Sequence, residues 1–130
     1  MAVVFRNPRG LPQKKYHNEP TLVEGIRFDS KKEARRYQEL LMQLKAGLIS
    51  NLKVKPRFKI MVLDQFLCNY TADFSYQNVV AKGYELKLGS TVVEDTKGKD
   101  PMTGWNTRTP VYNLKKRLMR IVFGIEVREV

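Results

Sequence analysis

Polar and apolar residues alternate along most of residues 52–97, and this two-residue period constrains the fold more than any other feature of the chain. Successive side chains of a β-strand point to opposite faces, so alternation predicts strands with one buried face. Pro56 fits the start or the edge of a strand, and Gly83 and Gly89 fit a hairpin-like extension. We therefore predict strands at residues 52–63, 66–76 and 91–97, with the extension at residues 77–90.

A helix is predicted on the N-terminal side of these strands. Ser30 and Glu33 fit a capping box, in which the serine hydroxyl caps the first turn and the glutamate reaches back, and Gly47 is the stop signal. One face of this helix is apolar and carries Tyr37, Leu40, Leu41, Leu44 and Leu48. Glu33 falls at the end of that face, where a carboxylate needs a partner such as a metal ion.

A second helix is predicted on the C-terminal side. Thr109 fits the N-cap, Pro110 the first helical position and Gly124 the end. Its apolar stripe consists of Val111, Leu114, Leu118, Ile121 and Val122, and a closing strand follows at residues 125–130. The order of helix, three strands, helix and strand predicts a single α/β domain with a mixed sheet flanked by helices.

Length and charge limit the classes of function. The chain has 130 residues, enough for one core without metal or disulfide staples, and its 24 Lys and Arg against 13 Asp and Glu give a net charge of +11. Such an excess indicates a polyanionic partner, with nucleic acid favoured over an anionic membrane. The single Cys68 forms no internal disulfide, and no apolar run matches a signal peptide or a membrane span, so a cytosolic location is expected.

The strand at residues 91–97 carries the residues with the clearest chemistry. Asp95 and Lys97 are two positions apart, so they share one face of a strand, and Asp73 lies on the polar face of the preceding strand. Carboxylates hold hard divalent cations, and an adjacent ammonium orients water or neutralises a phosphate. Glu94 is expected on the opposite face as a helper or a surface residue. A surface salt bridge is the alternative for the pair alone, but the surrounding acids and the basic charge favour phosphodiester hydrolysis.

Other hydrolytic chemistries find little support. His17 is the only histidine, which excludes histidine-rich zinc sites and makes a Ser-His-Asp triad improbable. The chain also lacks the glycine-rich phosphate-binding loop of nucleoside triphosphatases.

Four segments carry a family resemblance: residues 25–34, 70–74, 94–99 and 112–116. With the predicted element order, they resemble the PD-(D/E)XK nuclease superfamily, which has a restriction-endonuclease-like core. More narrowly, they resemble a phage and prophage family, formerly a domain of unknown function, grouped with Holliday-junction-resolvase-like endonucleases. The resemblance extends from about residue 14 to the end. Ala72 replaces the proline of the superfamily's name, and Asp95 replaces the more usual glutamate, which allows metal binding with a shorter reach.

The resemblance implies a role for each site residue. Asp73 and Asp95 resemble the metal ligands, and the Thr96 carbonyl is a third oxygen. Lys97 resembles the lysine that positions the attacking water and offsets charge at the phosphate. Glu33 matches a helix glutamate that completes the acidic site, although its capping role competes for the same oxygens.

We therefore expect a Mg²⁺-dependent endonuclease that cleaves branched DNA as a homodimer. Mn²⁺ is expected to substitute for Mg²⁺, and no organic cofactor is expected. The expected location is the cytoplasm, or the host cytoplasm if the protein is phage-encoded. Residues 1–20 are expected to form a basic irregular arm and residues 21–130 the nuclease domain. The expected DNA contacts are Lys14, Lys15, Arg35, Arg36, Lys99, Arg108, Lys115 and Lys116. A non-catalytic nucleic-acid-binding module and a nuclease that nicks or processes linear DNA remain alternatives.

Overall fold

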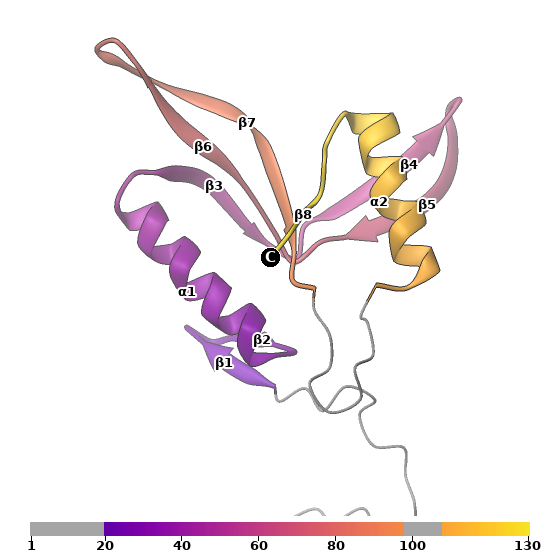
Figure 1. Ribbon diagram of the computed structural model, residues 1–130, viewed down its shortest axis with the longest axis horizontal. Coiled ribbons are helices and arrows are strands. Elements are labelled where there is room, and N and C mark those ends of the chain that lie inside the picture. The colour runs from indigo at the N-terminus through magenta and orange to yellow at the C-terminus, as the bar shows by residue number, and fades with distance from the viewer. Residues whose placement is uncertain (1–19, 98–107) are drawn as a thin grey trace, which may run out of the picture.

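Two helices and eight strands make up the computed structural model, which describes residues 20–97 and 108–130 (Figure 1). In chain order the elements are β1 (Thr21–Val23), β2 (Ile26–Phe28), α1 (Lys31–Lys45), β3 (Ile49–Val54), β4 (Arg57–Val62), β5 (Gln65–Thr71), β6 (Phe74–Lys82), β7 (Glu85–Asp95), α2 (Pro110–Phe123) and β8 (Arg128–Glu129). The prediction of a single α/β domain with a mixed sheet and two helices is confirmed.

The central sheet has the strand order β3-β6-β7-β8. Its first three strands are antiparallel, and β8 pairs in parallel with the end of β7, which makes the sheet mixed. Strands β4 and β5 form a separate hairpin that diverges from the long β6–β7 hairpin, with α1 beside β3 and α2 beside β4 and β5 (Figure 1). The elements therefore converge at the C-terminal end of β7.

Two of the predicted strands are wrong, because each is divided between two sheets. The predicted strand 52–63 splits into β3 and β4, and the predicted strand 66–76 splits into β5 and β6. Both breaks lie together: the Lys55 N–H donates to the Asp73 carbonyl over 2.8 Å, and the Ala72 N–H donates to the Pro56 carbonyl over 3.1 Å. Lys55 turns the chain with a φ of 51°. The alternation continues through the breaks, so the period did not reveal them.

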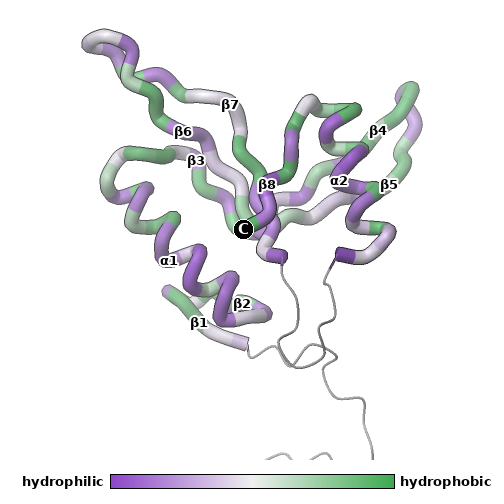
Figure 2. Tube along the Cα trace, in the orientation of Figure 1, coloured by the Kyte–Doolittle hydropathy of each residue, from purple (hydrophilic) through white to green (hydrophobic). Residues whose placement is uncertain are grey.

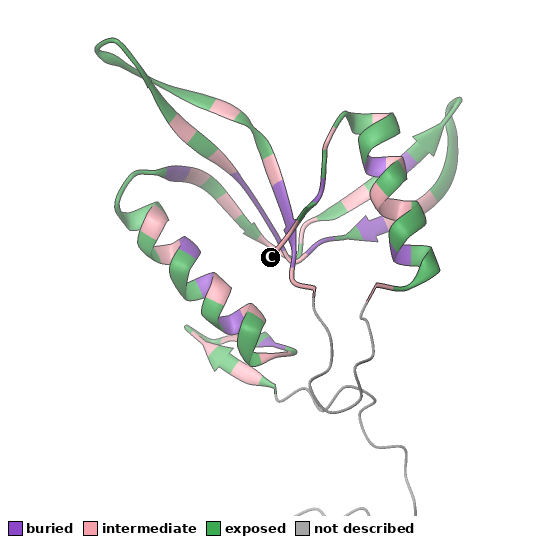
Figure 3. Cartoon of the chain, viewed as in Figure 1, coloured by how far each residue is buried: buried purple, intermediate pink, exposed green. Residues whose placement is uncertain are grey.

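The breaks also determine which of the two hydrophobic cores each strand packs against. Cys68, Tyr70 and Ala72 contact the core next to α2, whereas Phe74 belongs to the core next to α1, although all four occupy alternate positions. One core therefore lies on each face of the central sheet. Buried residues gather where the strands converge, while the outer parts of both hairpins are exposed (Figure 3).

The caps of both helices agree with the predictions. The Ser30 hydroxyl accepts the Glu33 N–H over 3.1 Å, and the Thr109 hydroxyl accepts the Tyr112 N–H over 3.1 Å. Gly124 ends α2 in the left-handed conformation, with a φ of 68°, which favours glycine.

The predicted apolar stripe of α2 is correct only in part, because Leu118 and Val122 pack against the core and the other three members do not. The buried residues are Tyr112 and Met119, whereas Val111, Leu114 and Ile121 are 59%, 59% and 69% exposed. Hydrophobic and hydrophilic residues are mixed along both helices (Figure 2), so the wheel alone did not select the buried side of α2. Leu48, assigned to the stripe of α1, is also exposed because it lies beyond the end of that helix.

Two further predictions need correction. The β1–β2 hairpin was not predicted; it turns at Glu24 and Gly25, both with positive φ, and places Phe28 with its ring centroid 5.0 Å from that of Tyr37 in the core. The closing strand is shorter than residues 125–130, because only Arg128 and Glu129 pair with β7.

Candidate active site

Asp73 lies in the connection between β5 and β6, where the chain passes from one sheet to the other. One of its carboxylate oxygens, Oδ2, accepts the Thr96 N–H over 2.6 Å. Burial raises the pKa of the Asp73 carboxyl above its ordinary value, and the Thr96 hydrogen bond and the positive charges of Lys97 and Lys55 oppose this rise. The break in the strands therefore gives Asp73 a fixed orientation toward the end of β7.

Asp95 is the last residue of β7 and is only 4% exposed. Its carboxylate accepts a hydrogen bond from the Tyr70 hydroxyl and one from the backbone of Asp73. Burial raises the pKa of Asp95 to about 6, Lys97 opposes the rise, and Glu129 on the neighbouring strand adds to it. A buried acid with this environment gains from any further positive charge.

Lys97 connects the two acids electrostatically. Its charge favours the ionised forms of both Asp73 and Asp95. The Lys97 ammonium lies 4.1 Å from the centroid of the Tyr112 ring, a cation–π contact, and its backbone N–H donates to the Val130 carbonyl over 3.0 Å. The structure thus brings Asp73, Asp95 and Lys97 into one site at the end of β7.

Glu33 faces the same site from the first turn of α1. The pKa of its carboxyl is raised to about 7, mainly by burial and further by the negative charges of Asp73 and Asp29, while Lys55 and a backbone hydrogen bond from Asp29 oppose the rise. Only the Ser30 half of the predicted capping box is therefore present as expected. The Glu33 carboxylate lies within electrostatic reach of Asp73, as a third acid at the edge of the site.

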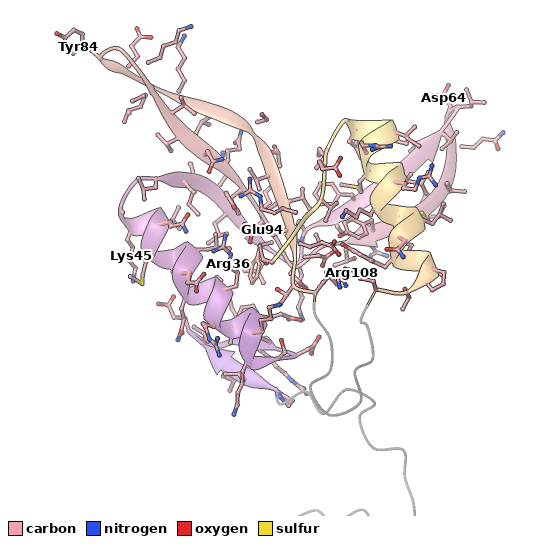
Figure 4. The ribbon with its side chains drawn as sticks, viewed as in Figure 1. Arg36, Lys45, Asp64, Tyr84, Glu94 and Arg108 are labelled. Carbon is pink, nitrogen blue, oxygen red and sulfur yellow. The ribbon has the colours of Figure 1, made fainter. Side chains whose placement is uncertain are left out.

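Glu94 is neither a surface residue nor a member of this site. It is fully buried and receives two hydrogen bonds from Arg36, Nε to Oε1 at 2.8 Å and Nη2 to Oε2 at 2.7 Å, and one from the Tyr76 hydroxyl. Arg36 reaches across from α1 toward Glu94 (Figure 4) and also bonds Glu39 over 2.9 Å. Arg36 is therefore a structural partner, and we withdraw it as an expected DNA contact. The available signal for this network was an acid directly after the apolar pair Val92 and Val93, on the strand face that carries Val92.

Two other expected DNA contacts are held by Glu129. Its carboxylate accepts from Arg108 over 2.8 Å, from Lys116 over 3.2 Å and from the Tyr112 hydroxyl over 3.2 Å. This network anchors the start of α2 to β8, beside the site. Lys115 is half-buried on the same helix.

Arg35 is exposed on α1 and, with Lys32, lines a hollow of about 200 Å³ that reaches Thr96. The Lys32 ammonium donates to the Lys97 carbonyl over 2.5 Å. Basic side chains therefore flank the site on the α1 side. Lys14, Lys15 and Lys99 lie outside the described residues.

A family model described as "Protein of unknown function (DUF1064)" matches residues 13–128, which is most of the chain. The chain belongs to this family. No curated protein and no solved structure matches it. The description of the DUF1064 family names no activity, so the chemistry has to be argued from the site itself.

The donor atoms of this DUF1064 site suit a hard cation. No three His, Cys, Asp or Glu side chains form a ready metal-binding group in the part of the chain that the structure describes. Mg²⁺ is nevertheless usually held by one or two carboxylates together with water and substrate phosphates, rather than by an all-protein cage. Asp73 accepts the Thr96 N–H through Oδ2, and Asp95 accepts the Tyr70 hydroxyl hydrogen through Oδ2 as well. Asp95, which is buried, and Asp73, which is half-buried, have no bonded cationic side chain among the described residues, and they therefore fit Mg²⁺.

The Thr96 hydroxyl adds an unusual polar atom to the site. It is buried and makes no hydrogen bond of normal geometry among the described residues, although it lies close enough to favour the charged form of Asp73. Buried polar atoms generally have partners, and exceptions cluster at functional sites.

Neither of the described helices is long and apolar enough to cross a membrane.

Proposed function

We propose that this DUF1064 protein is a metal-dependent DNA endonuclease that hydrolyses phosphodiester bonds, with a preference for branched DNA. The observation that carries the proposal is the meeting of Asp73, Asp95 and Lys97 at the end of β7, where burial raises the pKa of both acids. Perturbed acids of this kind are typical of functional sites. The preference for branched DNA comes from the resemblance alone, and the cytoplasmic location is proposed from the sequence, in which no apolar run matches a signal peptide or a membrane span.

Each residue has a distinct task in this proposal. Asp73 and Asp95, with the Thr96 carbonyl, would hold Mg²⁺, which when bound supplies positive charge at the phosphate and makes its bound water more acidic. Tyr70 and the Thr96 N–H fix the orientation of the carboxylates. Lys97, held over the Tyr112 ring, orients the attacking water and offsets charge on the phosphate.

Glu33 is suited to move the proton of that water. A carboxyl whose pKa is raised to about 7 exchanges its proton near neutral pH, which is the range in which a general base works best. Glu33→Gln keeps the size of the side chain but removes this exchange. We therefore expect slower cleavage with little change in DNA affinity.

The charge of the chain supports DNA as the partner. The net charge of +11 favours a polyanion, and acids on a DNA-facing surface repel phosphates unless a cation lies between them, which supports a bound cation at the site. A homodimer would supply two sites for paired cuts on a branched substrate. The exposed residues Val111, Leu114 and Ile121 on α2 offer an apolar face for a second copy, and Ile121→Glu tests it by sedimentation.

The proposal is tested by cleavage of four DNA substrates in Mg²⁺: a four-way junction, a flap, a linear duplex and a single strand. Asp73→Asn should abolish cleavage of all four, while Asp64→Asn is the matched control, because Asp64 is an exposed acid at the tip of the β4–β5 hairpin (Figure 4). Preference for the junction supports the branched substrate, and equal cleavage favours a general nuclease. DNA binding without any cleavage would contradict the proposal and favour a binding module.

A further inference from the structure

The β4–β5 hairpin has two faces of opposite character. Phe58, Ile60 and Tyr70 face the core beside α2. The alternate positions of β4, Arg57 and Lys59, are exposed on the other face. The hairpin therefore turns a basic face away from the core.

A hollow of about 510 Å³ lies on this basic face and is lined by Arg57, Lys59, Phe66 and Asn69. Lys59 and Asn69 are paired across the two strands. The Lys59 ammonium lies 5.7 Å from the centroid of the Phe66 ring, and Phe66 is 55% exposed. The four lining residues include two cations, an aromatic ring and an amide, and no acid.

The hairpin begins at the candidate active site. Lys55 precedes Arg57 by two residues, its backbone N–H donates to the Asp73 carbonyl over 2.8 Å, and its charge acts on both Asp73 and Glu33. Thr71, which pairs with Arg57, is two residues from Asp73. A strand of nucleic acid that leaves the site along β4 therefore meets Arg57 and then Lys59.

We propose that this face binds unpaired nucleotides of the DNA substrate next to the cleavage site. Phe66 stacks on a base, Arg57 and Lys59 contact successive phosphates, and Asn69 hydrogen-bonds a base edge. The inference deepens the proposed function and rests on it for the identity of the substrate. Single strands are favoured over duplex because base pairs hide the flat faces of the bases, whereas proteins that bind single strands combine a basic groove with exposed aromatic rings.

The β6–β7 hairpin provides the matched control. Its tip also carries an exposed aromatic residue, Tyr84 (Figure 4). Two exposed lysines, Lys82 and Lys87, lie on the strands beside it. Lys82 is paired in register with the acid Glu85, whereas Lys59 on β4 is paired with the amide Asn69, and Asp64 at the tip of the β4–β5 hairpin does not line the hollow. The two hairpins therefore differ in the feature that the proposal requires.

The test is the affinity of the full chain for a fluorescently labelled oligothymidine in Ca²⁺ buffer, measured by anisotropy. Phe66→Ala should weaken binding roughly fivefold or more, the range found for loss of one stacked base. Arg57→Gln with Lys59→Gln should lower the slope of log affinity against log salt by about 1.4, or about 0.7 for each lost phosphate contact on a single strand. Tyr84→Ala, and Lys82→Gln with Lys87→Gln, should change neither quantity.

Cleavage of a fully paired duplex in Mg²⁺ separates this inference from the proposed function. Phe66→Ala should lose affinity for oligothymidine, whereas the control Tyr84→Ala should keep both this affinity and the rate of duplex cleavage within about twofold of the parent. Unchanged oligothymidine affinity in both β4–β5 variants would overturn the inference, even if the parent cleaves DNA. If the parent cleaves no DNA but loses oligothymidine binding with Phe66→Ala, the binding face stands and the nuclease proposal fails. All these side chains are exposed, and thermal melting confirms that each variant is folded.

Discussion

Glu94 and Asp95 are neighbours on β7, both are buried, and their surroundings are opposite. Burial alone would raise the pKa of Glu94, but hydrogen bonds from Arg36 and Tyr76 outweigh it and hold the pKa below its ordinary value. Asp95 has no bonded cation in the described chain: burial raises its pKa to about 6, and Lys97 opposes this only through its charge. One acid is compensated by the fold, and the other is not.

This difference separates a structural acid from the one that we propose to be reactive. A buried carboxylate that receives a two-point bond from an arginine holds α1 against the sheet, and its charge is already compensated by the fold. A buried carboxylate without such a partner lowers stability unless it gains a proton or a cation. The alternating side chains of one strand thus place a structural acid on the α1 side and a reactive acid on the α2 side.

Removing the partner of Glu94 should have the largest effect on stability. Arg36→Met leaves a fully buried carboxylate without its cation, and breaking such a pair from one side costs about 3 to 5 kcal/mol of unfolding free energy. Urea denaturation measures the loss. Arg35→Met on the exposed face of α1 is the control, expected to change stability by about 0.5 kcal/mol at most. Equal effects of the two substitutions would mean that Glu94 is not compensated by Arg36.

The dependence of stability on pH should come from the other acids. Asp95 and Glu33, with pKa values raised to about 6 and about 7, bind protons more tightly in the folded than in the unfolded chain. The unfolding free energy should therefore fall as pH rises from about 4 to about 7 in cation-free buffer, by on the order of 2 to 3 kcal/mol for Asp95.

Asp95→Asn is the variant that checks this origin. It should remove much of the fall, whereas Glu94→Gln should not, because the pKa of Glu94 is lowered and its own contribution to stability rises with pH near its unfolded pKa. A stability that rises between pH 4 and pH 7 would contradict the raised pKa values.

Bound Mg²⁺ should offset the loss of stability that the buried, ionised acids cause at neutral pH. At about ten times its dissociation constant, a ligand that binds only the folded state adds about 1.4 kcal/mol to the unfolding free energy. We expect Mg²⁺ at pH 7 to raise the melting temperature of the parent and of Asp64→Asn, but not that of Asp95→Asn. A rise of equal size in all three would indicate nonspecific cation binding elsewhere.

The smallest change in stability is expected for Lys97. Lys97→Met loses a cation–π contact of about 0.5 to 1 kcal/mol but keeps an apolar chain over the Tyr112 ring. Because its charge favours the ionised forms of Asp73 and Asp95, the substitution should move the pH transition of stability upward. A transition that stays in place would show that Lys97 does not act on these acids.

Local signals account for what the sequence predicted well. Ser30, Thr109, Pro110 and Gly124 act through bonds or φ angles within a few residues, so both helices begin and end close to the predicted positions. The closeness of Asp95 and Lys97 also follows from their two-residue spacing. Asp73 was predicted to belong to the same site because it lies on the polar face of its predicted strand and because of the family resemblance.

Interactions between distant parts of the chain account for what was missed. The Arg36–Glu94 pair spans 58 residues, and no local pattern connects α1 to β7. The strand breaks at Lys55 and Asp73 keep the alternation intact, so only the pairing of strands reveals them. The buried side of α2 was mistaken because Tyr112 and Met119 face the core, whereas Val111, Leu114 and Ile121 are exposed, and only the packing of α2 against β4 and β5 reveals this.

The contrast between the two neighbouring acids is tested most directly by the rate of DNA cleavage in saturating Mg²⁺, with each variant corrected for its folded fraction. Asp95→Asn should lower the rate by about 100-fold or more, a loss of about 2.7 kcal/mol of transition-state stabilisation, while Glu94→Gln should stay within about tenfold of the parent. Cleavage by Asp95→Asn within about tenfold of the parent, or an equal loss in folded Glu94→Gln, would contradict the assignment of Asp95 as the reactive acid.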